Sequence, residues 1–231
     1  MKKNILEKIF AGMIASSMLL TACGTSSPGS TPSAAVESTS TTTSTEASEA
    51  EASAPASAES SEESSSTRLP DFVYEGDDEI LSACCSFTVD ELAKGYLEGD
   101  TIIPCPIIIA VDDSNPEDIL CYGIFDLYTY DLKGDTLETV SGGVNPGCFH
   151  ISKNESGKLE VVDFDFVESG SDYDESAKKV FGEYYEKFSE ISADSKSTEE
   201  IRKNFIKDYV TANNLPITKY KDYGWDAIDL F

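Results

Sequence analysis

The feature that most constrains this chain is an abrupt change of composition near residue 66. Residues 24–66 consist mainly of Ser, Thr, Ala and Glu, contain no aromatic residue, and have Val36 as their only large aliphatic residue. Such a segment cannot bury enough apolar surface to offset the entropy of ordering it, so we expect it to be disordered. A packed core must therefore form within residues 67–231, which have the length of one ordinary domain.

The low-complexity segment is also acidic. It contains seven glutamates and no lysine or arginine, and like charges extend a linker and keep it away from an anionic surface. Random-coil scaling gives the segment a span of roughly 35–40 Å. We therefore expect residues 23–66 to form a disordered spacer in front of the folded domain.

Residues 1–22 have the parts of an export signal. Three lysines form a positive region, an apolar stretch runs from Ile9 to Leu20, and small residues precede Cys23. The apolar stretch is shorter than the roughly 20 residues that a membrane-spanning helix needs. We therefore expect residues 1–22 to be removed as a signal peptide.

The four residues Leu20-Thr21-Ala22-Cys23 are similar to the lipobox of bacterial lipoproteins. The resemblance implies cleavage before Cys23 and attachment of acyl chains such as palmitate to this cysteine. Each buried methylene contributes about 0.8 kcal/mol, so several acyl chains together give a stable membrane anchor. We therefore expect an extracellular lipoprotein on the outer face of the cell membrane, which contacts the membrane through the lipid on Cys23 only.

The charge of the folded part excludes some partners. Residues 67–231 contain 35 Asp and Glu against 14 Lys and Arg, a formal charge of −21. This charge disfavours nucleic acid, whose phosphates attract Lys and Arg, and it disfavours direct contact with anionic lipid. Solubility is the simplest reason for the charge, and a cationic partner or a divalent metal is the alternative.

The spacing of apolar residues predicts an α+β domain. Asp77–Glu98 has apolar residues three and four positions apart, which predicts one long N-terminal helix, although Thr88–Glu91 also fits the start of a second helix. Two further helices are expected at the end of the chain. The first is capped by Asp172, and the second begins with the capping box of Ser197–Glu200.

Between the predicted helices the apolar period becomes two, which indicates strands. The five predicted strands are Ile102–Val111, Ile119–Leu132, Thr136–Ser141, Cys148–Lys153 and Lys158–Val167. No helical crossover separates them, so we expect an antiparallel meander. The alternation breaks at Val161 and Val162, which predicts a β-bulge there. A helix before a curved meander is the element order of cystatin-like or NTF2-like folds.

Several short motifs of the domain are similar to those of known proteins. They are Val140–Gly143 leading to Asn145–Gly147, Gly170–Tyr173 leading to Val180–Gly182, and Tyr223–Asp226. Together they resemble uncharacterised lipoproteins of Gram-positive gut anaerobes over most of residues 69–230. This group has no established activity, so the resemblance implies a type of source and no chemistry.

A thiol and an imidazole occur close together in Cys148-Phe149-His150. On a strand, Cys148 and His150 project to the same face, and such a pair can act as nucleophile and base. Side chains two residues apart on a strand lie about 6–7 Å from each other, which is longer than the hydrogen bond that this chemistry needs. We therefore assign no catalytic residue and no cofactor, and a small cell-wall or extracellular hydrolase is the alternative function.

Metal ligation and disulfides are the next candidates. Asp112–Asp118 is rich in the oxygen ligands that calcium prefers, but proline occupies the fifth position and the glycine of an EF-hand is missing. We predict no metal site, and calcium binding by this segment is the alternative. Five cysteines follow Cys23, and this odd number cannot pair completely. We expect most of them to be small buried residues, with a disulfide from Cys84 or Cys85 to Cys105 as the alternative.

Aromatic residues of the domain suggest a ligand-binding surface. They are Tyr122, Tyr128, Tyr130, Tyr220, Tyr223 and Trp225. Tyr122, Tyr128 and Tyr130 project to one face of the predicted sheet, and the tail with Trp225 could close over that face. These four residues are our candidate ligand-binding residues, because aromatic side chains on a concave sheet can form a pocket; alternatively, helices cover the face and the rings are core. We therefore expect a non-catalytic module that binds an envelope protein, peptide or glycan.

Overall fold

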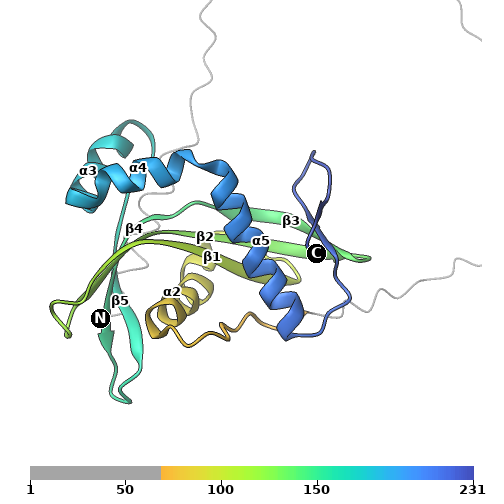
Figure 1. Cartoon of the computed structure of the whole chain (residues 1–231), viewed down its shortest axis with the longest axis horizontal. Helices are drawn as coiled ribbons and strands as arrows, with labels where there is room; N and C mark the ends of the chain where they lie inside the picture. The colour runs from red at the N-terminus through yellow and green to blue at the C-terminus, as the bar shows by residue number, and fades with distance from the viewer. Residues whose placement is uncertain (1–68) are drawn as a thin grey trace, which may run out of the picture. The chain divides into compact units, whose positions relative to one another are not determined.

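The computed structural model describes residues 69–231. Cys23, the predicted signal peptide of residues 1–22 and the predicted spacer of residues 23–66 lie outside the described residues. The described part is a mixed α+β domain in which a seven-stranded sheet has helices on both faces (Figure 1). None of the helices in this part is long and apolar enough to cross a membrane.

The first helix of the described part is shorter than predicted. Helix α2 spans Glu79–Asp90, and Asp78 caps it by accepting a hydrogen bond from the Leu81 backbone amide at 2.9 Å. The chain then changes to the 3-10 helix η2, Leu92–Gly95, which buries Leu92 against the sheet. The prediction of one long helix over Asp77–Glu98 is therefore wrong, because the apolar stripe continues in a different kind of turn.

The C-terminal helices also differ from the prediction. They are α3 (Tyr173–Phe181), α4 (Tyr185–Ala193) and α5 (Ser195–Ala212), with the 3-10 helices η3 (Gly170–Asp172) before α3 and η4 (Gly182–Tyr184) between α3 and α4. Gly182 has a φ of +52°, which ends α3 and divides the expected single helix. Asp172 makes no capping hydrogen bond through its side chain, and Asp194 caps α5 by accepting from the Ser197 backbone amide. Asp172 therefore occupies the expected N-cap position of α3 without the expected hydrogen bond, and the expected start of the last helix at Ser197 is wrong.

All five predicted strands are present, and two short ones follow. They are β1 (Thr101–Asp112), β2 (Ile119–Lys133), β3 (Thr136–Gly143), β4 (Pro146–Lys153), β5 (Leu159–Phe166), β6 (Lys219–Lys221) and β7 (Ile228–Asp229). Strand β1 pairs with one edge of β2, and β3 and β4 share the other edge. The simple meander is therefore wrong at β4, which pairs with the first part of β2 because β2 is long enough for two partners on one edge. Strand β6 adds to β3 in parallel.

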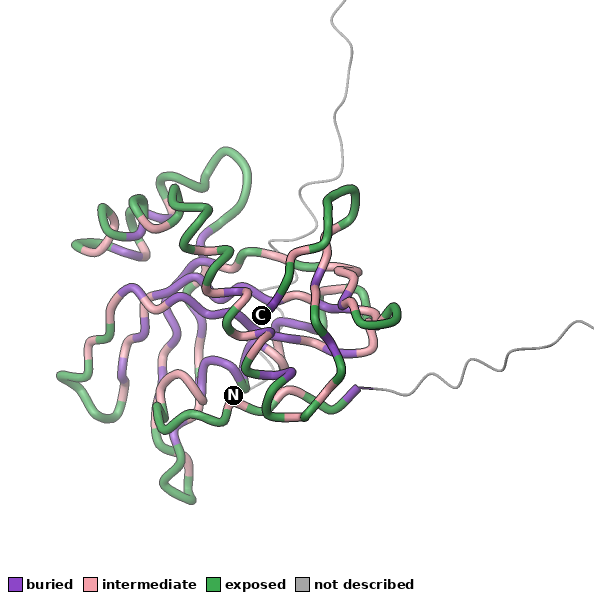
Figure 2. Tube along the Cα trace, turned by 45° about the vertical axis from the view of Figure 1, so that its right-hand side comes forward, coloured by how far each residue is buried: buried purple, intermediate pink, exposed green. Residues whose placement is uncertain are grey.

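The alternation of side chains along β2 divides the core into two layers. Cys121 and Phe125 face α2 and pack with Phe149. Ile124 and Tyr130 project to the opposite face, which α3, α4 and α5 cover. Buried residues follow the strands, and the exposed residues lie mainly in the turns and on the outer helix faces (Figure 2).

The two long edge strands of the sheet carry features that hinder further strand pairing. Pro104 and Pro106 lie in β1, where the missing N–H groups cannot bond to an added strand. In β5 the pairing shifts between Val161 and Asp163, so Val162 is left without a partner residue in β4. This shift confirms the predicted β-bulge, and bulges protect edge strands against aggregation.

Candidate functional site

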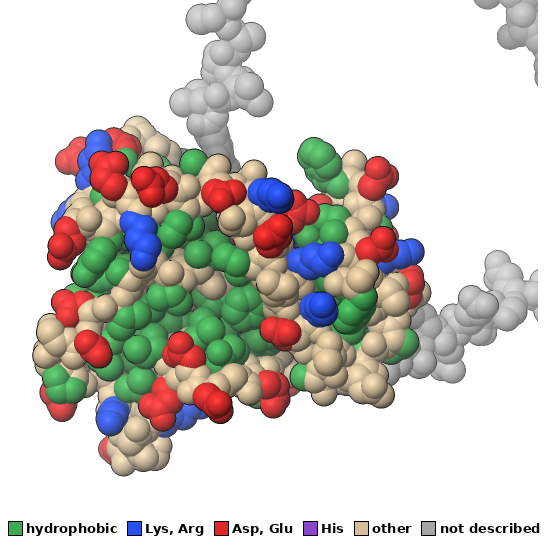
Figure 3. Space-filling model, in the orientation of Figure 1, with side chains coloured by type: hydrophobic (Ala, Val, Ile, Leu, Met, Phe, Trp, Pro, Cys, Tyr) green, Lys and Arg blue, Asp and Glu red, His purple; other side chains and the backbone are tan. Residues whose placement is uncertain are grey.

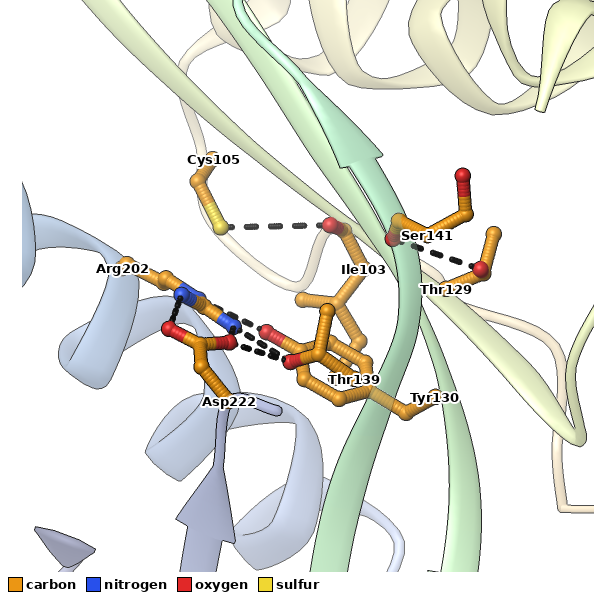
Figure 4. Close-up of polar contacts among 8 residues, drawn as sticks. All are labelled: Ile103, Cys105, Thr129, Tyr130, Thr139, Ser141, Arg202 and Asp222. Atoms are coloured by element: carbon orange, nitrogen blue, oxygen red, sulfur yellow. Dashed lines mark hydrogen bonds and ion pairs between the residues drawn. The ribbon is translucent and has the colours of Figure 1, made fainter. Parts of the chain in front are cut away.

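A buried arginine joins four parts of the chain. Helix α5 carries Arg202, which is 7% exposed. Its Nε donates to the Tyr130 hydroxyl at 2.9 Å, and its two terminal nitrogens donate to both carboxylate oxygens of Asp222 at 2.9 and 2.8 Å. Nη2 also donates to Thr139 Oγ1 at 2.8 Å, and this hydroxyl donates to Asp222 Oδ1 at 2.6 Å (Figure 4). We call Arg202, Tyr130, Thr139 and Asp222 the Arg202 centre.

Tyrosine rings surround the guanidinium group. Its central carbon lies 3.6 Å from the ring centroid of Tyr128 and 5.0 Å from that of Tyr220, distances at which a cation is attracted by an aromatic ring. The hydrogen bonds from Arg202 lower the pKa of Asp222, so this carboxylate stays ionised. A buried charge is stable only when it is paired and hydrogen-bonded, and the Arg202 centre meets both conditions. The centre therefore joins α5 to β2, β3 and the residue after β6.

The candidate ligand-binding residues do not line one pocket. Tyr128 and Tyr130 lie together, with ring centroids 6.3 Å apart, under α5 and beside Arg202. Tyr122 belongs to another apolar cluster, where its ring centroid lies 4.9 Å from that of Tyr184. Trp225 is 75% exposed. The structure thus places Tyr130, which is buried, and Tyr128, which is partly buried, together beside Arg202, and it leaves Tyr122 partly buried elsewhere and Trp225 exposed.

The exposed tryptophan lies on a tight turn between β6 and β7. The Trp225 backbone amide donates to the Asp222 carbonyl at 3.1 Å, and Gly224 has a φ of +81° that an L side chain rarely adopts. Tyr223 at the tip is 97% exposed, and apolar side chains project from this end of the domain (Figure 3). We call Asp222–Trp225 the aromatic turn. Its first residue is held by Arg202, and its last three residues are exposed to solvent.

The single histidine is held between two carboxylates. His150 Nδ1 lies 2.9 Å from Asp118 Oδ1, and Nε2 lies 3.3 Å from Asp165 Oδ2. Burial alone would lower the pKa of His150, but the two carboxylates outweigh burial and raise it. We call these three residues the His150 centre. Cys148 is buried, and burial raises the pKa of its thiol to about 12, so it lacks the thiolate that a nucleophilic cysteine needs near neutral pH.

Sequence reasoning missed a buried acid beside the Arg202 centre. Asp126 in β2 is 2% exposed, and its Oδ1 has no hydrogen-bond partner among the described residues. Burial raises the pKa of Asp126 to about 7, although the positive charge of Arg202 opposes the shift. The signal in the sequence is an acid between Phe125 and Leu127 in an otherwise apolar strand. A perturbed carboxyl group is a common feature of functional sites, but neither groove described below includes Asp126 in its lining.

Two grooves flank α2. One has a volume of about 910 Å³ and lies between α2, the loop before β2 and the β4–β5 hairpin. The other has a volume of about 260 Å³ and lies between α2 and Phe72–Tyr74. Within residues 69–231, no three His, Cys, Asp or Glu side chains are arranged to hold a metal ion.

The five cysteines of the described part are free and buried. The Sγ atoms of Cys84 and Cys121 lie 3.7 Å apart in the layer under α2. Cys105 faces the opposite layer, under α5. The alternative of a disulfide from Cys84 to Cys105 is therefore wrong, because the sheet lies between them, and Cys85 is likewise unpaired.

The chain matches no protein-family model, no curated protein and no solved structure.

Proposed function

We propose that this protein is a non-catalytic binding module of the cell envelope and that it contacts its partner through the aromatic turn. The observation that carries the proposal is the exposure of Tyr223 and Trp225 on a turn with a fixed base. Trp and Tyr are the side chains that most often dominate binding energy. Because Arg202 already holds Asp222, the turn has little freedom to lose on binding, and preorganisation of this kind increases affinity.

The envelope location is the second part of the proposal. It is supported by the lipobox-like Leu20–Cys23 and by the composition of residues 23–66. The lipid on Cys23 would hold the protein to the membrane, and the acidic spacer would hold the domain away from it. An envelope protein, peptide or glycan is then the class of partner within reach. Replacing Cys23→Ser should leave the precursor without lipid and impair its processing, and a variant that still matured and stayed on the membrane would contradict the anchor.

The hydrolase alternative has little support among the described residues. The buried thiol of Cys148, with its raised pKa, argues against a Cys–His nucleophile. The comparison with cystatin-like or NTF2-like folds stays a prediction, supported by the order of α2 and the antiparallel strands that follow it. Hydrolysis of an envelope polymer by the purified protein, with loss of activity on substituting one carboxylate, would contradict the non-catalytic proposal.

The single tryptophan makes the binding proposal directly testable. Trp225 is the only tryptophan of the chain, so its fluorescence reports the environment of the aromatic turn alone. We expect soluble peptidoglycan fragments or an envelope peptide to change the emission of Trp225 saturably. Calorimetry should then show loss of binding for Tyr223→Ala and Trp225→Ala. The matched control is Val144→Ala, which truncates another exposed apolar side chain and should leave binding unchanged.

A further inference from the structure

The groove of about 910 Å³ has an apolar floor. Its lining includes Ala83 and Phe87 of α2 and Leu159 and Val161 of β5. The unpaired bulge residue Val162 also lines it and is 42% exposed. An open groove with these side chains offers contact area to apolar groups of a ligand.

Acidic side chains form the rim of the same groove. They are Asp90, Glu91, Glu117, Asp118, Glu160 and Asp163, against only Lys158 and His150 as basic residues. Glu91 pairs with Lys94 and Asp118 pairs with His150. The carboxylate groups of Asp90, Glu117 and Glu160 make no ion pair or hydrogen bond within residues 69–231. Three carboxylates around an apolar floor thus have no cationic partner among the described residues 69–231.

We infer that this groove binds a basic peptide segment of a partner protein, with lysine or arginine at the rim and apolar side chains on the floor. Strand β5 contributes the consecutive residues Leu159–Asp163 to the groove. At about 3.3 Å per residue they match an extended peptide of about five residues. Complementary charge increases the association rate and excludes acidic competitors. The acidic residues 24–66 of the same chain are such competitors, so they do not suit the groove.

This site is separate from the aromatic turn, and it goes beyond the proposed function. A small metal ion does not suit the groove, because no three ligating side chains converge among residues 69–231. A polyamine would satisfy the rim and leave the apolar floor without contact. Both charge and apolar contact are therefore needed to fill the site.

The test uses the unlipidated mature chain, residues 23–231, and a fluorescein-labelled hexapeptide of alternating leucine and lysine. We expect saturable one-to-one binding in fluorescence anisotropy. The same peptide with glutamate in place of lysine should not bind. The double variant Asp90→Lys/Glu160→Lys should weaken binding at least tenfold. Its matched control, Glu183→Lys/Glu190→Lys near and on α4, makes the same charge change on exposed residues outside the groove and should change binding less than twofold.

Several outcomes would overturn the inference. They are absence of binding, an equal loss in the two double variants, and displacement by spermine at the concentration at which unlabelled peptide displaces. Circular dichroism checks that the variants fold. If Asp90→Lys/Glu160→Lys does not fold, the variant Asp90→Asn/Glu160→Gln replaces it, and we expect this variant to weaken binding at least threefold. Trp225→Ala should bind the peptide as the parent does. Loss of peptide binding in Trp225→Ala would assign the peptide to the aromatic turn and overturn the groove site, whereas failure of the aromatic turn to bind its own probes leaves this result unchanged.

Discussion

Arg202 and His150 are both basic side chains held by acidic partners, but their surroundings differ. The Arg202 side chain is almost completely buried, and Asp222 binds it through both carboxylate oxygens. His150 is partly exposed, and each of its two ring nitrogens lies close to a different carboxylate. Both carboxylates are more exposed than that of Asp222. Arginine keeps its charge at every pH of interest, whereas histidine changes charge near neutrality.

The difference shows that similar ion pairs can have different roles in one small domain. Removing one partner of a buried pair leaves an uncompensated charge, whereas an exposed pair contributes little because water already solvates it. The Arg202 centre is therefore a permanent connection between α5 and the aromatic turn. The His150 centre is a weaker connection between the loop before β2 and strands β4 and β5, and its strength depends on pH.

The largest expected effect follows from breaking the buried pair. Arg202→Met should lower the free energy of unfolding by about 3–5 kcal/mol, because Asp222 and Tyr130 lose their partner. Arg202→Lys should lose less, since lysine keeps the charge but cannot donate to both oxygens of Asp222. Urea denaturation measures both values. If Arg202→Met lowered the free energy of unfolding by less than about 1 kcal/mol, the Arg202 pair would stabilise the fold no more than the exposed His150 pairs do.

Substitution of the buried acid beside Arg202 should stabilise the protein at high pH, whereas substitution of Arg202 should destabilise it. The pKa of Asp126 is about 7 in the folded protein and about 3.9 when unfolded, so the folded state binds more protons between these values. Stability should therefore fall as pH rises from 4 to 8, and Asp126→Asn should remove this fall. We expect the effect of the substitution to change by about 2–4 kcal/mol between the two pH values, in favour of the variant at pH 8. Parallel unfolding slopes for the two proteins across this range would contradict the buried-acid assignment.

A smaller effect is expected at the exposed pair. The pKa of His150 is raised in the folded state, so its stabilisation is complete below the unfolded pKa of about 6.5 and is lost as pH rises through the folded pKa. His150→Gln should cost up to about 1 kcal/mol at pH 5 and nothing measurable at pH 8.5. Urea denaturation at both pH values measures the cost. Because the chain has one histidine, proton NMR can follow its titration directly. A pKa of His150 below 6.5 would show that Asp118 and Asp165 do not stabilise its charged form.

The smallest effect on stability is expected at the tip of the aromatic turn. Trp225→Ala removes an exposed side chain and should change the free energy of unfolding by less than about 0.5 kcal/mol. Asp222→Ala removes the carboxylate that Arg202 holds and should cost several times more. Thermal unfolding of the two variants compares the base of the turn with its tip. Equal losses would mean that Trp225 stabilises the domain through packing instead of standing free in solvent.

The strands could be predicted because their signal is local. Alternation in β2 assigned the correct faces, and the interruption of alternation in β5 located the bulge at Val162. The ends of the helices were harder to predict from the sequence. Gly182 interrupts an apolar stripe that continues beyond it, and the stripe through Leu92 continues in a 3-10 helix. The position of β4 depends on competition for the edge of β2, which no local pattern encodes.

The Arg202 centre was missed for a different reason. Arg202, Ile206 and Tyr209 lie three and four residues apart and form the buried stripe of α5, so a cation on this stripe was the available signal. Its acceptors Thr139 and Tyr130 lie more than sixty residues away, and spacing along a chain does not indicate such partners. The exposure of Trp225 likewise depends on how the chain folds after β6.

The link between Arg202 and Asp222 also has a mechanical consequence. A force applied to the aromatic turn would act on a segment whose adjoining strand β6 has only three residues. The two guanidinium–carboxylate hydrogen bonds of Arg202 connect the base of the turn to α5, and the hydrogen bond from Thr139 connects it to β3. Separating the turn from the domain therefore requires breaking the Arg202–Asp222 pair as well as the short backbone pairing of β6.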